Sequence, residues 1–313
     1  MAHKTLISKF QTIAIAVTLP IAAITAAPQT AEAFGFTTVY SFGDSLLDTG
    51  NVYAATNGLF PPNVLYPSNG RFSNGPVWTE YFAPKVGASL QTLAFGGART
   101  DSTNNIPGFP GLTQQIGSIS VGDPNALYVL WAGGNDYLNA QRTDPVPTVT
   151  NLSNAVLALT NVGAKNIAVG NLPNLGALPG TSADPVRAAG LNQLTQAHNS
   201  LLAQSLSVIR QSQPNINLFT LDFNFLFSDA IANPNQYGFT NVSDSCLLTG
   251  CTTPNTYLFW DEIHPTTAGH AQISEFAYAS LQAQAVPEPS VAIGMLLGSA
   301  FLTRVAHRGR VKR

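Results

Sequence analysis

Charged side chains are scarce in this sequence. They make up 10% of its 313 residues, with 14 lysines and arginines against 16 aspartates and glutamates. The formal net charge of −2 excludes a nucleic-acid-binding protein that works through a basic surface. Hydrophobic residues reach 45%, which excludes intrinsic disorder, because disorder requires high charge and few apolar side chains. Two cysteines are too few for a disulfide scaffold or a cysteine-rich zinc site.

The few charges are unevenly distributed. Residues 34–286 contain 7 basic and 14 acidic side chains, so this part carries a net charge of about −7. An acidic domain gains nothing electrostatically from anionic polymers or anionic membrane surfaces. Its length suits one large α/β domain with a substantial core.

Residues 1–33 have the features of a secretory signal peptide. Two lysines precede an apolar stretch at 13–27, and Ala31 and Ala33 supply the small side chains that signal peptidase reads. We therefore expect cleavage before Phe34 and export. The alternative is a retained membrane anchor, for which the apolar stretch is short.

The end of the chain, 287–313, contains a second export feature. Pro287-Glu288-Pro289 precedes a 14-residue apolar stretch, and five basic residues follow it. This order resembles the PEP-CTERM sorting signal. The resemblance implies processing by an exosortase and delivery to the envelope, cell surface or extracellular matrix of a Gram-negative-type bacterium. The alternative is a plain C-terminal membrane anchor, although a spanning helix needs about 20 residues.

Short apolar runs alternate with helical patterns in the central part. The strands are expected at 37–42, 126–131, 166–169 and 216–221, with a weaker one near 90–94, and helices over 149–159, 191–209 and 266–284. Continuous apolar runs are typical of strands buried on both faces of a parallel sheet. The alternation predicts a doubly wound, three-layer α/β/α sandwich, whose ligands bind beyond the carboxyl ends of the strands.

A serine follows the first predicted strand. Ser45 stands next to a glycine, in F-G-D-S-L-L-D-T-G-N at 42–51, and we expect it to open a helix. There it would be placed as a nucleophile, with its backbone N–H facing a developing oxyanion. The chain contains no G-x-S-x-G elbow. Taken alone, G-D-S-L is better explained as an ordinary helix cap.

Three further blocks carry residues suited to acyl transfer. Asn135 follows a strand and offers a side-chain N–H, while the glycines in A-F-G-G-A at 94–98 let a backbone N–H approach a ligand. Asp261 and His264 lie three residues apart, so the carboxylate can hold the imidazole while its other nitrogen faces a serine.

Together, the blocks at 42–51, 94–98, 132–136 and 259–266 resemble those of the GDSL, or SGNH, hydrolases, in the family's order. The resemblance spans the central part and implies a flavodoxin-like fold with five parallel strands, and ester hydrolysis through an acyl-serine. It implies that Ser45 is the nucleophile, His264 the general base and acid, and Asp261 its orienting carboxylate. The oxyanion hole would comprise the backbone N–H groups of Ser45 and Gly97 and the side chain of Asn135.

Some residues near these blocks have competing interpretations. Gly96 is an alternative oxyanion donor to Gly97, and Thr92 stands where the family usually has Asn, so different local hydrogen bonding is expected there. We expect Asp44 and Asp48 to be structural, as helix caps or dipole partners.

We expect structural roles for the other histidines and for the two cysteines. His198 falls on an apolar helix stripe and is expected in the core. His270 has no partner at a metal-ligand spacing, so we expect neither a metal nor another cofactor. Cys246 and Cys251 are expected to form a disulfide in an exported protein, and to hold the loop that precedes the Asp–His block.

Aromatic and proline residues after the serine could line an acyl pocket or pack in the core: Phe60, Pro61, Pro62, Tyr66, Phe72 and Trp78. The substrate class predicted is a lipid, lysophospholipid or acylated-polysaccharide ester. A non-catalytic matrix protein on a hydrolase scaffold and an acyltransferase are the alternatives, and the oligomeric state stays open.

Overall fold

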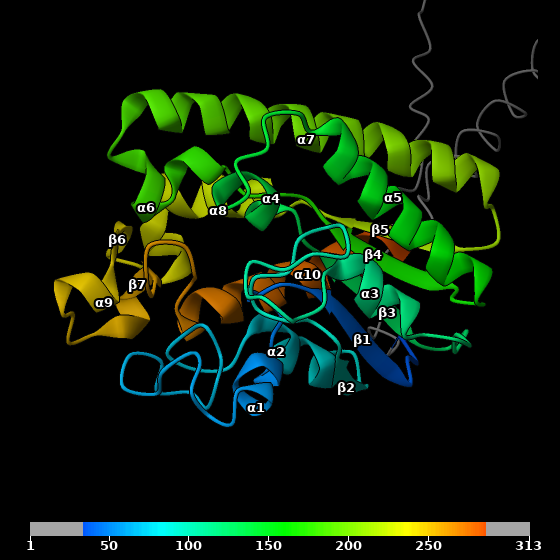
Figure 1. The fold of residues 1–313 in the computed structure, drawn as a ribbon, viewed down its shortest axis with the longest axis horizontal. Coiled ribbons are helices and arrows are strands. Elements are labelled where there is room, and N and C mark those ends of the chain that lie inside the picture. The colour runs from blue at the N-terminus through cyan, green and yellow to red at the C-terminus, as the bar shows by residue number, and fades with distance from the viewer. Residues whose placement is uncertain (1–33, 286–313) are drawn as a thin grey trace, which may run out of the picture. The chain divides into compact units, whose positions relative to one another are not determined.

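The computed structural model describes residues 34–285, and the two predicted export segments lie outside this range. Five parallel strands form the central sheet, in the order β2-β1-β3-β4-β5 (Figure 1). The strands are β1 (Thr38–Gly43), β2 (Ser89–Thr92), β3 (Leu127–Trp131), β4 (Asn166–Gly170) and β5 (Asn217–Leu221). All five lie within two residues of the predicted positions, so the doubly wound parallel sheet is confirmed.

The position of each strand in the sheet explains how clear its sequence pattern is. β3 lies at the centre and all five of its side chains are buried, which gives the continuous apolar run LYVLW. β2 lies at an edge and alternates exposed and half-buried positions, so its sequence SLQT carries a weak signal.

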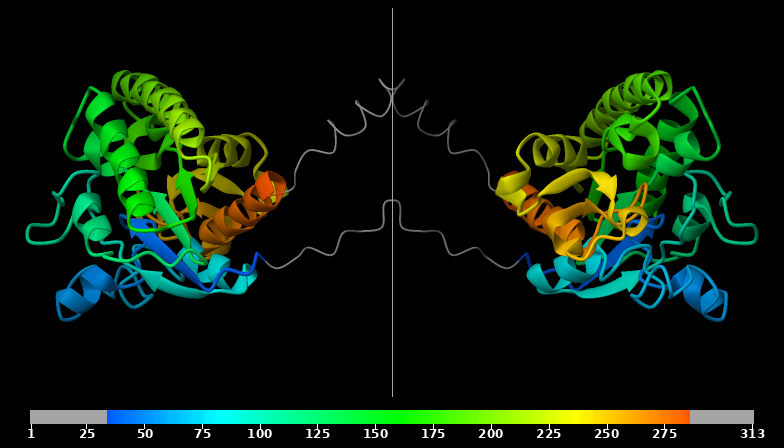
Figure 2. Two further views of the ribbon diagram at one scale, coloured as in Figure 1. Left: turned by 90° about the vertical axis from the view of Figure 1, so that its right-hand side faces the viewer. Right: turned by 90° about the vertical axis from the view of Figure 1, so that its left-hand side faces the viewer.

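Helices cover both faces of the sheet (Figures 1 and 2). The buried side chains of α2 (Trp78–Lys85), α8 (Phe223–Ala232) and α10 (Thr267–Ala285) share one apolar cluster. Those of α3 (Leu112–Gly117), α5 (Val146–Asn161) and the second half of α7 (Pro185–Ser212) share the other. Two separate apolar clusters, one on each face, define the three-layer α/β/α sandwich.

The long helix α7 forms where its sequence signals place it. Asp184 is the N-cap, and its carboxylate accepts hydrogen bonds from the N–H groups of Val186 and Arg187. Pro185 occupies the first helical position, where its missing N–H costs nothing. The helix ends at Ser212, two residues before Pro214.

Shorter elements complete the described range: α1 (Asn51–Ala55), α4 (Gly134–Leu138), α6 (Pro179–Ser182), α9 (Cys246–Thr249), a second sheet of β6 (Asn241–Ser245) and β7 (Tyr257–Phe259), and 3-10 turns at Leu175–Ala177, Pro234–Tyr237 and Pro254–Thr256. The sequence patterns did not indicate the small sheet. Between residues 34 and 285, no helix combines the length and apolar character needed to cross a membrane.

Candidate active site

Ser45, His264 and Asp261 form one hydrogen-bonded chain. The Nε2 atom of His264 lies 2.7 Å from Oγ of Ser45, and its Nδ1 atom lies 2.6 Å from Oδ2 of Asp261. The other carboxylate oxygen of Asp261 accepts the backbone N–H groups of Ile263 and His264, at 2.8 and 2.7 Å. The short turn after β7 therefore places the imidazole between carboxylate and hydroxyl, where Nε2 can accept the serine proton.

The carboxylate of Asp261 and the imidazolium of His264 stabilise each other's charge. Burial by itself would raise the pKa of Asp261, but the positive charge of His264 and the hydrogen bonds to the carboxylate lower it to about 2. Burial would lower the pKa of His264, yet Asp261 and Asp44 raise it above 6.5. Asp261 thus stays ionised and stabilises the imidazolium that forms when Ser45 loses its proton.

Tyr66 is a further partner that the sequence patterns did not reveal. Its hydroxyl donates a hydrogen bond of 2.7 Å to Oδ2 of Asp261, across 195 residues of sequence. Burial and the neighbouring carboxylate raise the pKa of this phenol, so Tyr66 remains a donor. It helps to hold the carboxylate against the imidazole.

The segment after β1 corrects one prediction. Ser45 does not open a helix, because residues 44–47 form a single turn and α1 begins only at Asn51. The N–H groups of Leu47 and Asp48 both donate to the carbonyl of Asp44. The serine N–H makes no hydrogen bond within residues 34–285, so it is free to donate beside Oγ.

Asp48 is structural, as predicted. Its carboxylate accepts the N–H groups of Gly50, Asn51 and Val52 at the start of α1, and that of Gly96 at 2.8 Å. Asp48 thus joins the serine turn to the glycine loop. The N–H of Gly96 is therefore occupied.

Gly97 is the glycine of this loop that lines the serine cavity. It lines the same cavity as Ser45, and among the described residues its N–H has no hydrogen-bond partner. Its φ of +77° favours glycine, and a Cβ here would lie 2.6 Å from Oδ1 of Asn104. Its free N–H favours Gly97 over Gly96 as the oxyanion donor.

Thr92, which stands where the family usually has Asn, ends β2 and shares a 2.9 Å hydrogen bond with Ser41.

Asn135 also lines the cavity. Its Nδ2 atom donates to the carbonyl of Ala98 at 3.1 Å and more weakly to Asp44 at 3.4 Å, while its Oδ1 atom accepts from Asn105 at 3.0 Å. The contacts with Asn105 and Ala98 fix the orientation of the amide, with Nδ2 as the group next to Asp44. One N–H of Asn135 is therefore held only weakly and can turn to a ligand.

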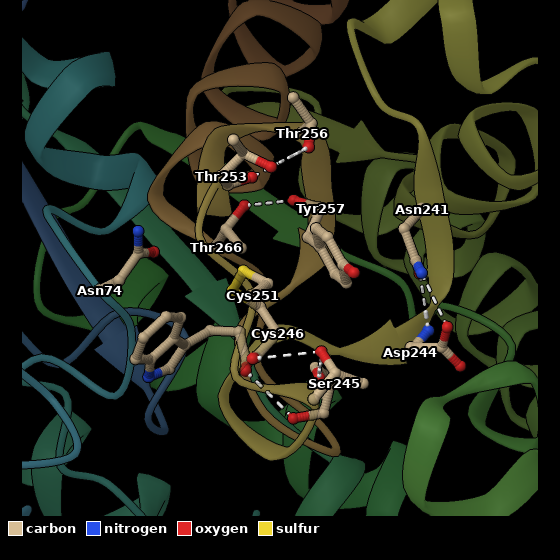
Figure 3. Close-up of a disulfide and its surroundings, with 12 residues drawn as sticks. Asn74, Asn241, Asp244, Ser245, Cys246, Cys251, Thr253, Thr256, Tyr257 and Thr266 are labelled. Carbon is tan, nitrogen blue, oxygen red and sulfur yellow. Dashed lines mark hydrogen bonds between the residues drawn. A yellow bond between two sulfur atoms is a disulfide. The ribbon is translucent and has the colours of Figure 1, made fainter.

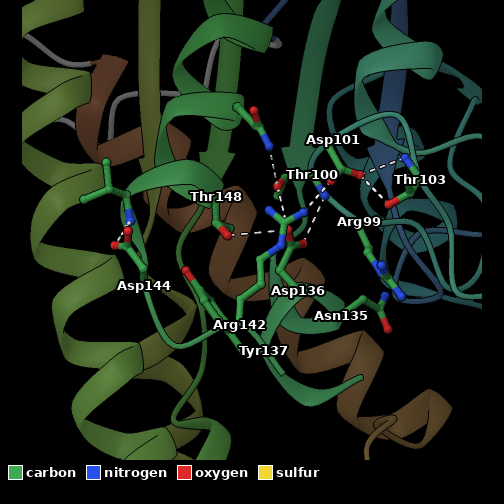
Figure 4. Close-up of polar contacts among 12 residues, drawn as sticks. Arg99, Thr100, Asp101, Thr103, Asn135, Asp136, Tyr137, Arg142, Asp144 and Thr148 are labelled. Atoms are coloured by element: carbon green, nitrogen blue, oxygen red, sulfur yellow. Dashed lines mark hydrogen bonds and ion pairs between the residues drawn. The ribbon is translucent and has the colours of Figure 1, made fainter. Parts of the chain in front are cut away.

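A buried ionic network holds the segment that carries Asn135 (Figure 4). Asp136 is fully buried and accepts the N–H and hydroxyl of Thr100, at 3.0 and 2.8 Å. Arg142 reaches Asp136 at 3.1 Å and also pairs with Asp101. The network joins α4 to the loop after Gly97, so the two candidate oxyanion donors are held relative to each other.

Asp44 caps the serine turn through its carboxylate, in line with the expected structural role, and it also borders the cavity. It lines the cavity next to Ser45 and is 5% exposed, with a 3.1 Å hydrogen bond from the N–H of Leu46. Burial raises its pKa to about 6, against the opposing effects of that N–H and of His264. Its hydrogen bond with Asn135 makes it a neighbour of the candidate oxyanion hole.

The cavity above Ser45 has a volume of about 210 Å³. Its walls are mostly apolar and include Leu138, Leu172, Leu175, Leu178 and Phe227. Of the six predicted pocket residues, Phe60 and Phe72 line it, whereas Trp78 is a core residue against Trp131 and Phe223. Pro61, Pro62 and Tyr66 are not among its lining residues. The remaining walls come from the segments after β2, β3 and β4, from the turn at 263–265 and from helix α8.

Cys246 and Cys251 form a disulfide (Figure 3). The bond closes the short helix α9, and the neighbouring Ser245 and Leu247 both donate to the carbonyl of Trp260, at 3.2 and 2.8 Å. Trp260 precedes Asp261 directly. The disulfide therefore supports the turn that carries the Asp–His pair, as predicted.

The two other histidines of the described range lie in the core. His198 is fully buried and shares a 2.8 Å hydrogen bond with the hydroxyl of Tyr137, and burial lowers its pKa to about 4. His270 is equally buried on α10, and its pKa falls to about 3. Both are neutral at neutral pH, and the expected core position of His198 is confirmed.

Comparisons with known proteins place the chain in one family. The family model described as GDSL-like Lipase/Acylhydrolase matches residues 39–277. A thermolabile hemolysin of Vibrio parahaemolyticus is 32% identical over 271 residues, and the match covers 76% of this chain and 62% of the hemolysin. A phosphatidylcholine-sterol acyltransferase of Aeromonas hydrophila is 28% identical over 313 residues, covering 80% and 91% of the two chains.

More distant similarities are also found. A GDSL esterase/lipase of Arabidopsis thaliana is 25% identical over 320 residues, with 80% of this chain and 83% of the plant protein covered. Among solved structures, an acetyl xylan esterase of Geobacillus stearothermophilus aligns with a TM-score of 0.49 and 13% identity, covering 80% of this chain and 97% of the esterase.

Proposed function

Since this chain belongs to the GDSL-like lipase/acylhydrolase family and is a carboxylic ester hydrolase, we propose that it is an exported enzyme that cleaves esters through an acyl-serine. The proposal rests on the contact of 2.7 Å between Oγ of Ser45 and Nε2 of His264, beside an apolar cavity. His264 takes the serine proton as Oγ attacks the ester carbonyl.

Three hydrogen-bond donors stabilise the negative charge that develops on the carbonyl oxygen. They are the N–H groups of Ser45 and Gly97 and the side chain of Asn135, whose long hydrogen bond to Asp44 gives way to the oxyanion. His264 then gives its proton to the leaving alcohol. Water, activated by the same imidazole, hydrolyses the acyl-serine and restores the hydroxyl.

The substrate is an ester whose acyl chain fits an apolar cavity: a lipid, a lysophospholipid or an acylated polysaccharide. The Aeromonas hydrophila relative is named for acyl transfer from a phospholipid to a sterol, which favours lipid esters as the first class to test. Export is supported by the signal-like residues 1–33, by the PEP-CTERM-like tail 287–313, and by a disulfide, which persists in oxidising compartments.

The direct test uses Ser45→Ala and a series of p-nitrophenyl esters from acetyl to palmitoyl. Loss of a serine nucleophile lowers kcat on the order of 10⁶-fold, so the variant should be inactive while its circular dichroism matches the wild type. Wild-type turnover by a pure, folded Ser45→Ala preparation would exclude the acyl-serine mechanism.

A further inference from the structure

A second cavity adjoins the one above Ser45. It also has a volume of about 210 Å³, and the two cavities share three lining residues: Pro173, Leu178 and Phe227. Beyond this common wall, the second cavity is lined by Asn174, Ala177, Ser228, Ile231 and Phe259. Most of these lining side chains are apolar, as in the first cavity.

Phe227 is the largest side chain of the common wall. It comes from α8, is only 5% exposed, and its ring lies against that of Phe259, with centroids 6.2 Å apart. Leu178, 4% exposed, lies beside the same two cavities. Both side chains are held by packing, so the wall between the two cavities is part of the folded state.

The orientation of a bound ester follows from the chemistry. His264 must protonate the leaving alcohol, so the alcohol lies on the side of the cavity that His264 lines. On that side the ring of Phe72 packs 5.5 Å from the imidazole, and Phe60 packs on Phe72. The acyl chain then lies against the wall that the segment after β4 and helix α8 form. Phe227 stands in that wall.

We propose that Phe227 sets the acyl-chain length, and that the second cavity, beyond the shared wall of Pro173, Leu178 and Phe227, is a continuation of the acyl site suited to the distal methylenes of a fatty acyl group. This inference rests on the proposed function. The cavity above Ser45, about 210 Å³ in volume, is smaller than the roughly 300–1,000 Å³ of common ligand sites, so among the proposed esters the wild type should favour those with the shorter acyl chains. Removing the ring joins the two cavities.

The test is the ratio of kcat/KM for p-nitrophenyl octanoate to that for the acetate. Each methylene accommodated by an apolar pocket is worth roughly 10–200-fold, so Phe227→Ala should raise the ratio by at least about tenfold. Phe227→Leu keeps an apolar side chain in the core and should give a smaller rise. This second variant tests the same point if the alanine variant does not fold, as judged by circular dichroism.

Two further variants make the test specific. Phe225 lies on the same helix but is 57% exposed, packs on Phe276 and lines neither cavity. The ratio of kcat/KM for octanoate to acetate in Phe225→Ala should therefore equal that of the wild type. Ala177→Leu extends a side chain into the second cavity only, and in the Phe227→Ala background it should reverse the gain.

The outcomes separate this inference from the proposed function. A folded Phe227→Ala variant with an unchanged ratio, or an equal gain in Phe225→Ala, would overturn the inference while the esterase activity stands. A gain for longer alcohols in a series of alkyl acetates, without one for longer acyl chains, would also overturn it. If the wild type hydrolyses no ester, or Ser45→Ala remains active, the proposed function itself fails.

Discussion

Asp261→Asn should inactivate the enzyme by changing the tautomer of His264. Oδ1 of Asp261 accepts two backbone N–H groups, so in the variant the amide oxygen must occupy this position. The amide NH₂ then faces Nδ1 of His264, in place of the carboxylate oxygen that lies 2.6 Å away. An N–H donor facing Nδ1 requires that nitrogen to be unprotonated, which puts the proton on Nε2.

The size of the loss can be worked out from this inversion. A protonated Nε2 cannot accept the proton of Ser45, although the 2.7 Å contact is preserved. The same substitution in a serine protease triad lowers kcat by about 10⁴-fold through the wrong tautomer, and we expect a loss of that order. Tyr66 also loses its carboxylate acceptor, which adds to the loss.

The pH profile supplies a second readout. In the wild type, Asp261 raises the pKa of His264 above 6.5, so kcat/KM should fall as the pH falls through that raised pKa. Without the carboxylate charge the pKa of His264 falls, and the acid limb of Asp261→Asn should move to lower pH. The assay is hydrolysis of p-nitrophenyl butyrate between pH 5 and pH 9.

Glu262→Gln is the matched control, since it removes the same charge from the exposed neighbouring residue. It should keep nearly full activity and the wild-type acid limb. If Asp261→Asn stays within about tenfold of the wild type, the tautomer argument is refuted. If its activity falls but the acid limb stays in place, Asp261 does not set the pKa of His264.

Three more predictions concern the oxyanion hole, the disulfide and the chain ends. Asn135→Ala should lower kcat by roughly 10²–10³-fold with little change in KM, and a raised KM with unchanged kcat would make it a substrate-binding residue instead. Replacing Cys246 and Cys251 by alanine should cost about 2 kcal/mol by the chain-entropy model, or about 4–8 °C in Tm, as measured by thermal unfolding; an unchanged Tm would contradict this. Intact mass of the protein from its native host should show a species that starts near Phe34 and ends near Val286, and a chain that keeps Arg313 at the cell surface would reject the sorting signal.

Much of the fold could be predicted because its signals are local. The buried strands appear as apolar runs such as LYVLW in β3, and α7 carries its own cap and terminator in Asp184 and Pro214. The prediction of a helix at the serine turn was wrong, because a capping pattern has the same local sequence whether one turn or several come after it. The path of the chain beyond this turn depends on Asp48, whose carboxylate binds the N–H of Gly96 in a distant loop.

The sequence by itself determined the sheet, its helical layers, and the residues able to perform acyl transfer, because burial on both faces and the four family blocks are encoded in consecutive residues. Only the tertiary structure decided that Gly97 lines the serine cavity while the N–H of Gly96 is bound by Asp48, that Tyr66 supports Asp261, and that Phe227 lies between two cavities. Tyr66 and Asp261 lie 195 residues apart, and the cavity walls come from segments that meet only at one edge of the sheet. Such contacts depend on packing between distant segments, and packing leaves no periodic trace in the chain.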